Sequence, residues 1–260
     1  MAADDKTNPG TPGAPIIEIV DLHKSFGDTE VLKGINLNVP VGSTLVILGG
    51  SGSGKTVLMK HMIGLLKPNS GKVIVEGEDI VPFGAEELEQ LRKKFGMVFQ
   101  AAALFDSMTV YENVSFALRE HRKELGEAKM RAIVRDKLAI VGLKDVEDKY
   151  PASLSGGMRK RVGLARAIVL DPKIVLYDEP TTGLDPITTD YVDEMILDAK
   201  KQLGVTSVVI SHHIASAFKV ADNIAFLYQG EIVDQGHPST LRHTQHPGAK
   251  LFLQTWFGKN

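Results

Sequence analysis

Four short runs of apolar residues along the chain each end at a polar or glycine-rich segment. These runs span 44–48, 95–99, 174–177 and 207–210. Continuous apolar runs, rather than alternating ones, are typical of parallel strands that are covered on both faces. In open α/β sheets, ligands bind beyond the carboxyl ends of the strands. We therefore expect the segments that follow the four runs to meet at one sheet edge: Gly49–Thr56, Gln100, Asp178 with Glu179, and His212.

The rest of the hydrophobic pattern predicts strands near both ends of the chain and helices between them. Segments 16–40 and 71–80 contain short strands with turn signals at Gly27-Asp28 and Asn69-Ser70-Gly71, which predict a small antiparallel sheet. Strands are expected again at 224–228 and 231–234, on either side of Gln229-Gly230.

Two long segments show helical spacing. Apolar residues recur three or four positions apart within 101–170, which predicts a helical subdomain inserted between Gln100 and Asp178. Segment 186–203 is also predicted to be a helix, and one of its faces holds Tyr191, Met195, Ile196 and Ala199.

The segment after the first apolar run matches a phosphate-binding loop. Residues 49–56 spell GGSGSGKT, which fits G-x-x-x-x-G-K-[ST] at every fixed position. A helix from Lys55 to Leu66 is predicted to follow, with Leu58, Met62 and Leu65 on one face. Glycines let successive N–H groups face an anion, and the helix N-terminus adds partial positive charge. A flexible Gly/Ser turn is the alternative, but such a turn requires neither the strand nor the helix.

A loop of this kind predicts ATP and Mg²⁺ as ligands. Lys55 is expected to reach the β- and γ-phosphates, and Thr56 to ligate Mg²⁺. The phosphate-binding residues are expected to be Gly49, Gly50, Ser51, Gly52, Ser53, Gly54, Lys55 and Thr56.

The acidic pair after the third run suits hydrolysis of a bound nucleotide. Asp178 is a candidate for the Mg²⁺ shell, because Mg²⁺ prefers a few carboxylates together with waters and phosphate oxygens. Glu179 is the candidate general base for the attacking water. The alternative is an acidic pair that only ends a strand before Pro180.

Two further strand ends carry polar candidates. Gln100 can orient water or complete the metal shell, although a glutamine after a strand is often only solvated. His212 can donate to a γ-phosphate, but a lone histidine at a strand end is more often structural. Its neighbour His213 leaves open which of the two faces the ligand.

A second glycine-rich turn begins a helix at residues 154–158. Ser155 is a good N-cap, and Gly156 and Gly157 leave backbone N–H groups open to an anion. One chain does not need two phosphate cradles, so the turn is expected to face the γ-phosphate of a partner chain in a head-to-tail pair. An ordinary capped helix is the alternative. Residues Arg159, Lys160, Arg161 and Arg166 are interpreted as a mixture of solvated face and phosphate-attracting charge.

These motifs, in this order, resemble the ABC-transporter ATPase subunits over about residues 16–237. The resemblance implies an α/β fold of the P-loop NTPase type: an ABC nucleotide-binding domain with a RecA-like core, a small antiparallel β subdomain and a helical signature subdomain. It implies that Gln100 is the Q-loop residue, Ser155-Gly156-Gly157 the signature and Asp178-Glu179 the Walker B motif. Asp185 would lie in the D-loop, His212 would be the switch, and Phe26 would stack on adenine, although an aromatic residue near a strand is more often core.

Segment 100–121 and the signature LSGGM further resemble the Mla-type ATPases, the MlaF-like and Mce-associated proteins of lipid trafficking. This resemblance implies an ATPase that powers phospholipid transport between inner and outer membranes. It implies a homodimer at the cytoplasmic face of the bacterial inner membrane, with MlaE-like permease, MlaD-like substrate-binding and MlaB-like STAS partners. His213 departs from the aspartate usual in the family. Import of amino acids or another small solute stays open as the alternative.

Composition agrees with an ATPase that contacts membrane subunits without spanning the membrane. The 260 residues carry a net charge of −2, which offers no basic field for nucleic acid, and no cysteine for thiol or metal chemistry. No apolar run approaches the roughly 18 residues of a membrane span. Residues 1–14 are expected to form a disordered tail, 15–237 the ATPase domain and 238–260 a C-terminal extension.

Other classes of protein fit less well. A soluble translation- or repair-type relative of the same fold usually fuses two such domains, and kinases and small GTPases have no place for the 154–157 turn. The extension ends in an apolar cluster, which is expected either to pack on its own subunit or to clasp a neighbour. The cluster consists of Leu251, Phe252, Trp256 and Phe257.

Overall fold

The computed structural model describes residues 15–257, with side chains described up to residue 254. The predicted tail at 1–14 lies outside the described residues. The chain folds as two compact units: unit 1 holds the residues up to Leu91 and from Ile210 onward, and unit 2 holds Arg92–Val209. None of the helices within 15–257 is long and apolar enough to cross a membrane.

Unit 1 begins with the predicted antiparallel sheet, in the strand order β2-β1-β4-β5. Strands β1 and β2 form one long hairpin, closed by Gly27 and Asp28, and Gly27 adopts the positive φ of 57° that a tight hairpin turn requires. These two strands are longer than the short strands that the sequence predicts. The strands are β1 (Pro15–Phe26), β2 (Thr29–Pro40), β4 (Ser70–Val75) and β5 (Glu78–Asp79).

Strand β3 (Thr44–Leu48) is fully buried and carries the phosphate-binding loop. It pairs in parallel with β9 (Asn223–Tyr228), which pairs antiparallel with β10 (Glu231–Gly236). The sequence predicted these last two strands but not the pairing of β3 with β9. The helix after the loop, α1 (Lys55–Met62), is shorter than predicted. Gly64 adopts a left-handed φ of +63° just beyond it, so Leu65 leaves the helix and is 50% exposed.

The remaining helices of unit 1 include the C-terminal extension. They are α2 (Ala85–Arg92), which ends at the start of unit 2, α7 (Ile214–Val220), α8 (Pro238–Leu241) and α9 (Pro247–Phe257). In α9, Ala249 and Leu253 are buried and the Phe252 ring lies 5.2 Å from the Phe226 ring of β9. These contacts favour packing on the chain's own surface over a clasp, whereas the side chains of Trp256 and Phe257 lie outside the described residues.

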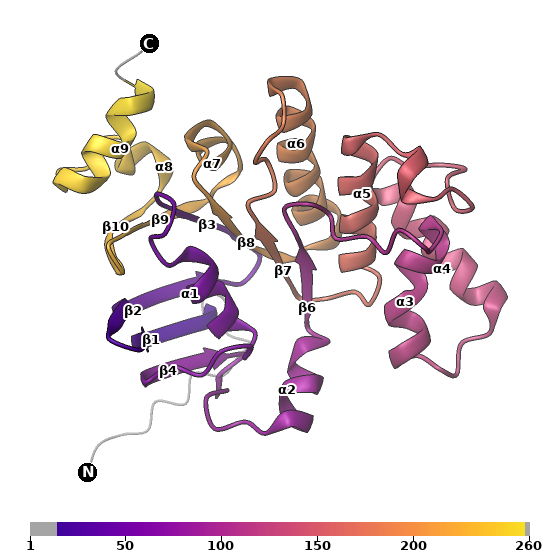
Figure 1. Cartoon of the computed structure of the whole chain (residues 1–260), viewed down its shortest axis with the longest axis horizontal. Coiled ribbons are helices and arrows are strands. Elements are labelled where there is room, and N and C mark those ends of the chain that lie inside the picture. The colour runs from indigo at the N-terminus through magenta and orange to yellow at the C-terminus, as the bar shows by residue number, and fades with distance from the viewer. Residues whose placement is uncertain (1–14, 258–260) are drawn as a thin grey trace. The chain divides into compact units, whose positions relative to one another are not determined.

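Unit 2 contains the other parallel strands and the predicted helical region. Strand β7 lies between β6 and β8 and pairs in parallel with β6, and β8 runs into unit 1. Helices α3, α4 and α5 pack on one another, as Figure 1 shows. The elements are β6 (Phe95–Val98), β7 (Ile174–Asp178), β8 (Thr206–Ser211), α3 (Val110–His121), α4 (Glu127–Ile140), the 3₁₀ turn Pro151–Ser153, α5 (Gly156–Ala167) and α6 (Pro186–Leu203).

Helix α6 has the predicted bounds, and its predicted face is buried except at Tyr191. Met195, Ile196 and Ala199 are buried, whereas Tyr191 is 71% exposed. Tyr191 lies four residues before Met195, so the two share a face as predicted, and both line one open cavity.

Candidate functional site

The phosphate-binding loop of unit 1 has a backbone that only glycine can supply at some positions. Gly52 and Gly54 adopt positive φ angles of 76° and 104°. A Cβ on Gly49 would lie 2.3 Å from the carbonyl oxygen of Leu227, so a side chain there has no room. Residue types and backbone therefore agree in this loop, as the motif predicts.

The polar side chains of the loop fit a phosphate ligand. The buried Lys55 donates from Nζ to the carbonyl oxygens of Gly49, at 2.9 Å, and Gly50, at 3.0 Å. Ser53 Oγ is buried and has no hydrogen-bond partner among the described residues. A buried hydroxyl without a partner and a lysine at the loop opening are groups that phosphate oxygens would satisfy.

The hydroxyl of Thr56 suits the predicted metal role. Thr56 lies in the first turn of α1, and the residue is exposed. A hydroxyl and a carboxylate are hard oxygen ligands of the kind that Mg²⁺ prefers. Thr56 and Asp178 are thus chemically suited to Mg²⁺, although their joint role stays a prediction.

The strand end before His212, the predicted switch, lies beside the start of the loop. Gly49 donates its backbone N–H to the carbonyl oxygen of Ser211 at 3.3 Å. The next residue, His212, is exposed, whereas His213 is half-buried and accepts at Nδ1 from the Ser216 N–H at 3.3 Å. His213 therefore caps α7, the role an aspartate would fill, and His212 is the histidine that faces outward.

Phe26 ends β1 in unit 1. Its side chain is 48% exposed, and Lys24 Nζ lies 5.2 Å from its ring centroid. An exposed ring is not part of the core, so the core alternative for Phe26 is wrong. One open aromatic face is what stacking on a base needs.

Unit 2 carries the acidic pair at the end of β7. Asp178 is the last residue of the strand, and Glu179 adopts a left-handed φ of +49°, which is costly for a non-glycine residue. Thr182 Oγ1 donates to Glu179 Oε2 at 3.0 Å and so orients the carboxylate. Such backbone strain clusters at functional sites. Gln100, beyond β6, is exposed.

The signature turn and Asp185 line one cavity of about 830 Å³ in unit 2. Ser155 caps α5 by accepting from the Met158 N–H at 3.2 Å, as predicted. Asp185 caps α6 by accepting from the N–H groups of Ile187 and Thr188, both at 3.0 Å. Hydrogen bonds from Thr188, through its side chain and then its backbone, lower the pKa of Asp185.

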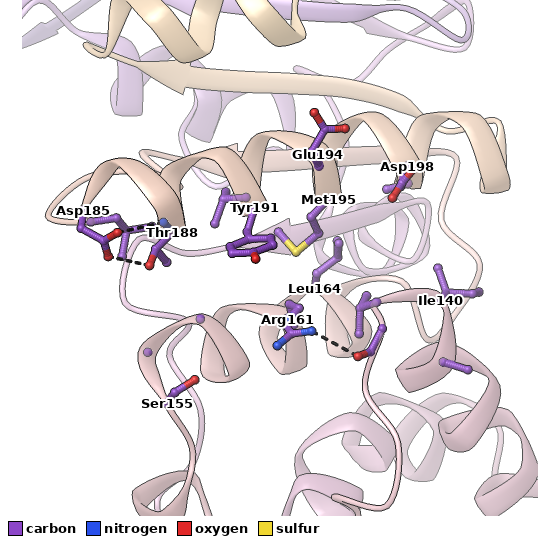
Figure 2. Close-up of a pocket in the computed structure, with 18 of the residues that line it drawn as sticks. Ile140, Ser155, Arg161, Leu164, Asp185, Thr188, Tyr191, Glu194, Met195 and Asp198 are labelled. Carbon is purple, nitrogen blue, oxygen red and sulfur yellow. Dashed lines mark hydrogen bonds between the residues drawn. The ribbon is translucent and has the colours of Figure 1, made fainter.

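Figure 2 shows how two helices wall this cavity, with Tyr191 and Met195 projecting from α6 toward α5. The glycines at the start of α5, Gly156 and Gly157, line the cavity beside Ser155. The structure thus brings together two motifs, the signature and Asp185, that are about thirty residues apart in the sequence.

The basic residues after the signature have a role that the sequence interpretation missed. Each donates to a backbone carbonyl oxygen: Arg159 to Leu154, Lys160 to Pro180, Arg161 to Gly142, and Arg166 to both Ala102 and Ala103. They therefore fasten α5 to neighbouring segments. The only sequence signal was the position of Lys160, one turn before the buried Leu164 and so on the packed face of the helix.

The candidate residues thus fall into two groups, each placed within its own unit. Unit 1 holds the phosphate-binding loop, Phe26 and His212, and unit 2 holds Gln100, Asp178, Glu179, the signature and Asp185. The predicted meeting of the two groups at one sheet edge stays a prediction.

Known proteins identify the family. Residues 32–182 match the family model described as ABC transporter. The probable ribonucleotide transport ATP-binding protein mkl of Mycobacterium tuberculosis is 45% identical over 94% of this chain and 68% of its own length. The phospholipid transport ATP-binding protein MlaF of Haemophilus influenzae is 37% identical over 92% of this chain and 90% of its own. The methionine import protein MetN of Mesorhizobium japonicum is 40% identical over 85% and 60%.

Solved structures agree with this assignment. The chain superposes on cbiO1 from Clostridium perfringens with a TM-score of 0.83 at 31% identity, over 95% of this chain and 97% of that one. It superposes on MJ0796, an ATP-binding cassette solved as a dimer with ADP and Pi, with a TM-score of 0.77 at 30% identity, over 85% and 98%. The chain therefore belongs to the ABC transporter family and is an ATP-hydrolysing subunit of that family.

Proposed function

We propose that two copies of this chain bind ATP between them and that its hydrolysis powers phospholipid transport between the inner and outer membranes. The observation that carries the proposal is that one chain holds two glycine-rich turns, each at the start of a helix and each suited to bind an anion. The loop at 49–56 matches the whole phosphate-binding motif, and residues 155–157 begin a helix and line a cavity of unit 2. A second anion site is redundant unless it serves the nucleotide of a partner chain.

Each chain would contribute one half of each ATP site. Gly49–Thr56 of one copy would hold the triphosphate, and Ser155 with Gly157 of the other would close over the γ-phosphate. Asp185 would lie at the same seam, since it lines the cavity with the signature. The γ-phosphate is the contact that differs between open and closed pairs, so ATP would favour the closed pair and hydrolysis would release it.

The chain's own residues would carry out hydrolysis. Lys55 would leave the carbonyl oxygens of Gly49 and Gly50 to stabilise phosphate charge. Glu179, oriented by Thr182, would accept a proton from the attacking water, and His212 would donate to the γ-phosphate. Thr56, Asp178 and Gln100 would hold Mg²⁺, which neutralises charge on the phosphates when bound. Phe26 would stack on the base.

An apolar groove in unit 2 suits a membrane permease. The groove holds about 350 Å³ and is lined by three partly exposed aromatic side chains, Phe99, Phe105 and Phe116. Several exposed aromatic residues around one groove are typical of a protein interface. A short cytoplasmic helix of a permease would fit here, beside Gln100, and would hold the ATPase at the cytoplasmic face of the membrane.

Phospholipid is the cargo supported by the likeness to MlaF together with the sequence pattern, although the relatives as a group carry different cargoes. The likeness to MlaF spans nine-tenths of both chains, and segment 100–121 carries the Mla-type pattern. The likeness to MetN supports the second candidate, import of an amino acid or another small solute. Purification of the complex with its membrane partners, followed by mass spectrometry of the bound molecules, decides between them: bound phospholipid supports the first and a bound amino acid the second.

The hydrolytic role of Glu179 is tested by Glu179→Gln. We expect kcat to fall by about 10²-fold or more, because an amide cannot accept the proton, while ATP still binds. The variant should accumulate as an ATP-bound dimer, measured by size-exclusion chromatography with light scattering. Unchanged turnover would remove Glu179 from the mechanism.

The second half of the site is tested in the same background. Adding Ser155→Arg to Glu179→Gln should abolish the ATP-dependent dimer, since the bulky side chain blocks the signature turn. Nucleotide affinity of the monomer, measured with a fluorescent ATP analogue, should stay unchanged. A loss of monomer affinity would place Ser155 at its own chain's nucleotide and would contradict the paired site.

A further inference from the structure

Lys160 is a buried lysine with an unusual partner. It lies one turn into α5 and is 8% exposed, and its ammonium donates to the carbonyl oxygen of Pro180. No carboxylate of the described residues pairs with it. Burial lowers the pKa of Lys160. A buried ammonium with a neutral partner costs free energy, so a role other than stability would account for it.

The acceptor of this hydrogen bond belongs to the turn that carries Glu179. Glu179 adopts a left-handed φ of +49° and directly precedes Pro180, and a residue before proline favours extended backbone. The backbone of Glu179 is therefore strained twice, and such a conformation persists only where the surroundings hold it. Lys160 fixes one side of the turn.

The other side of the turn is fixed by Thr182. Its N–H donates to the Glu179 carbonyl oxygen at 3.2 Å, and its Oγ1 donates to Glu179 Oε2 at 3.0 Å. Thr182 acts from within the turn, whereas Lys160 anchors the turn to a separate and rigid element. Without that anchor, the strained backbone would be free to relax and the carboxylate would move.

The anchoring helix is also the signature helix. Ser155 caps α5, and Gly156 and Gly157 form its first turn at the cavity wall. Lys160 follows Gly156 by four residues, so both lie on one face of the helix, one turn apart. Because α5 is rigid, the position of its first turn also sets the position of the Lys160 ammonium.

We propose that Lys160 is a positioning residue for hydrolysis: from the signature helix, its hydrogen bond to Pro180 holds Glu179 in the conformation that accepts the proton of the attacking water. This proposal rests on the proposed role of Glu179. Lys160 is buried and its ammonium already donates to the Pro180 carbonyl oxygen, so it is not expected to bind the nucleotide. Its removal should therefore change turnover and leave nucleotide binding intact.

The test uses the full chain and Lys160→Met, which keeps the length of the side chain and removes the donor. We expect kcat to fall by about 10- to 100-fold, because a small misplacement of a reacting group costs that much. The KM for ATP and the affinity for a fluorescent ATP analogue should change less than about twofold. Lys160→Arg, which keeps a donor of similar reach, should recover most of the lost turnover. Lys129→Met, an exposed lysine on α4, is the matched control and should behave like wild type.

Two further measurements make the outcome decisive. Lys160→Met added to Glu179→Gln should still form the ATP-dependent dimer, which shows that Lys160 acts after closure. Wild-type turnover of Lys160→Met, failure of Lys160→Arg to recover turnover in a folded protein, or loss of nucleotide binding in both variants would overturn the proposal. Normal hydrolysis by Glu179→Gln alone would instead refute the proposed function, whatever Lys160 does.

Discussion

Single glycines in this chain act in two different ways, by backbone conformation and by close approach. Gly42 and Gly71 both adopt positive φ angles, 71° and 93°, but their surroundings differ. Nothing lies within 4 Å of a Cβ built on Gly42, whereas a Cβ on Gly71 would lie 2.2 Å from the backbone oxygen of Asp21. Substituting each of these two glycines therefore separates the free-energy cost of a left-handed backbone from the cost of a steric clash.

Alanine substitution at these two glycines should give different losses of stability. Gly42→Ala should lower the free energy of unfolding by about 1–2 kcal/mol, the cost of a left-handed alanine. Gly71→Ala should lower it by about 1–3 kcal/mol more, because β1 and β4 must move apart to admit a methyl group. Urea unfolding followed by circular dichroism measures both. Equal losses of unfolding free energy in the two variants would mean that β1 and β4 accommodate the methyl group without cost.

The same residue shows where sequence interpretation ends. The Asn69-Ser70-Gly71 signal predicted a turn, but β4 already begins at Ser70 and Gly71 lies inside the strand. The requirement for glycine arises from Asp21, fifty residues earlier, and no local pattern records such a contact. The acceptor of Lys160 was missed for the same reason.

Elements whose signals are local were predicted well. The phosphate-binding loop, the N-cap Ser155 and both ends of α6 follow from residues within one or two turns, where Asp185 and Gly204 cap α6. The end of α1 was misplaced because apolar residues continue past Gly64, and apolar period alone does not show that Gly64 turns the backbone left-handed. Spacing thus predicts which element forms, and the cap decides where it ends.

The N-cap of α7 makes this helix sensitive to pH. His213 accepts from the Ser216 N–H through Nδ1, which requires the neutral ring. Burial, and then the charge of His212, lower the pKa of His213 below 6.5. The unfolded chain therefore binds a proton more readily than the folded chain, so stability rises with pH in this range. Burial also lowers the pKa of His61, which contributes with the same sign.

We accordingly expect the free energy of unfolding to be largest above about pH 6.5 and to fall as the pH decreases below that value. The slope cannot exceed about 1.4 kcal/mol per pH unit for each histidine. His213→Asn keeps a good N-cap acceptor without this titration and should reduce the slope. Urea unfolding of both proteins at several pH values between about 5 and 8 measures it. The same slope in both would assign the pH dependence to other groups.

At the scale of the whole molecule, each chain carries two different parts of the proposed ATP site, one in each unit. Unit 1 offers the loop at 49–56, where the Ser53 hydroxyl has no hydrogen-bond partner among the described residues, and unit 2 offers a signature turn that lines a cavity. A single sequence gives little direct evidence of pairing between copies, because each motif is recognisable without its partner. The pairing of two chains was inferred because a second anion-binding turn is redundant within one chain. For the C-terminal extension, the sequence left two alternatives: packing on its own subunit or contact with a neighbour.

The packing of α9 predicts that the tail stabilises its own subunit. Leu253 is buried and Phe252 packs against Phe226, whereas Leu251 is exposed on the same helix. Burying Leu253 contributes about 1.5–3 kcal/mol, and the half-buried Phe252 adds less than that. Deletion of 246–260 should therefore lower the melting temperature clearly. Leu253→Ser should lower the melting temperature in part and Leu251→Ser hardly at all, as measured by differential scanning calorimetry.

The deleted chain, carrying Glu179→Gln, should still form the ATP-dependent dimer, because the predicted seam involves the loop at 49–56 and the signature rather than α9. A deletion that left the melting temperature unchanged but abolished the dimer would reverse the conclusion and make the tail a clasp between copies.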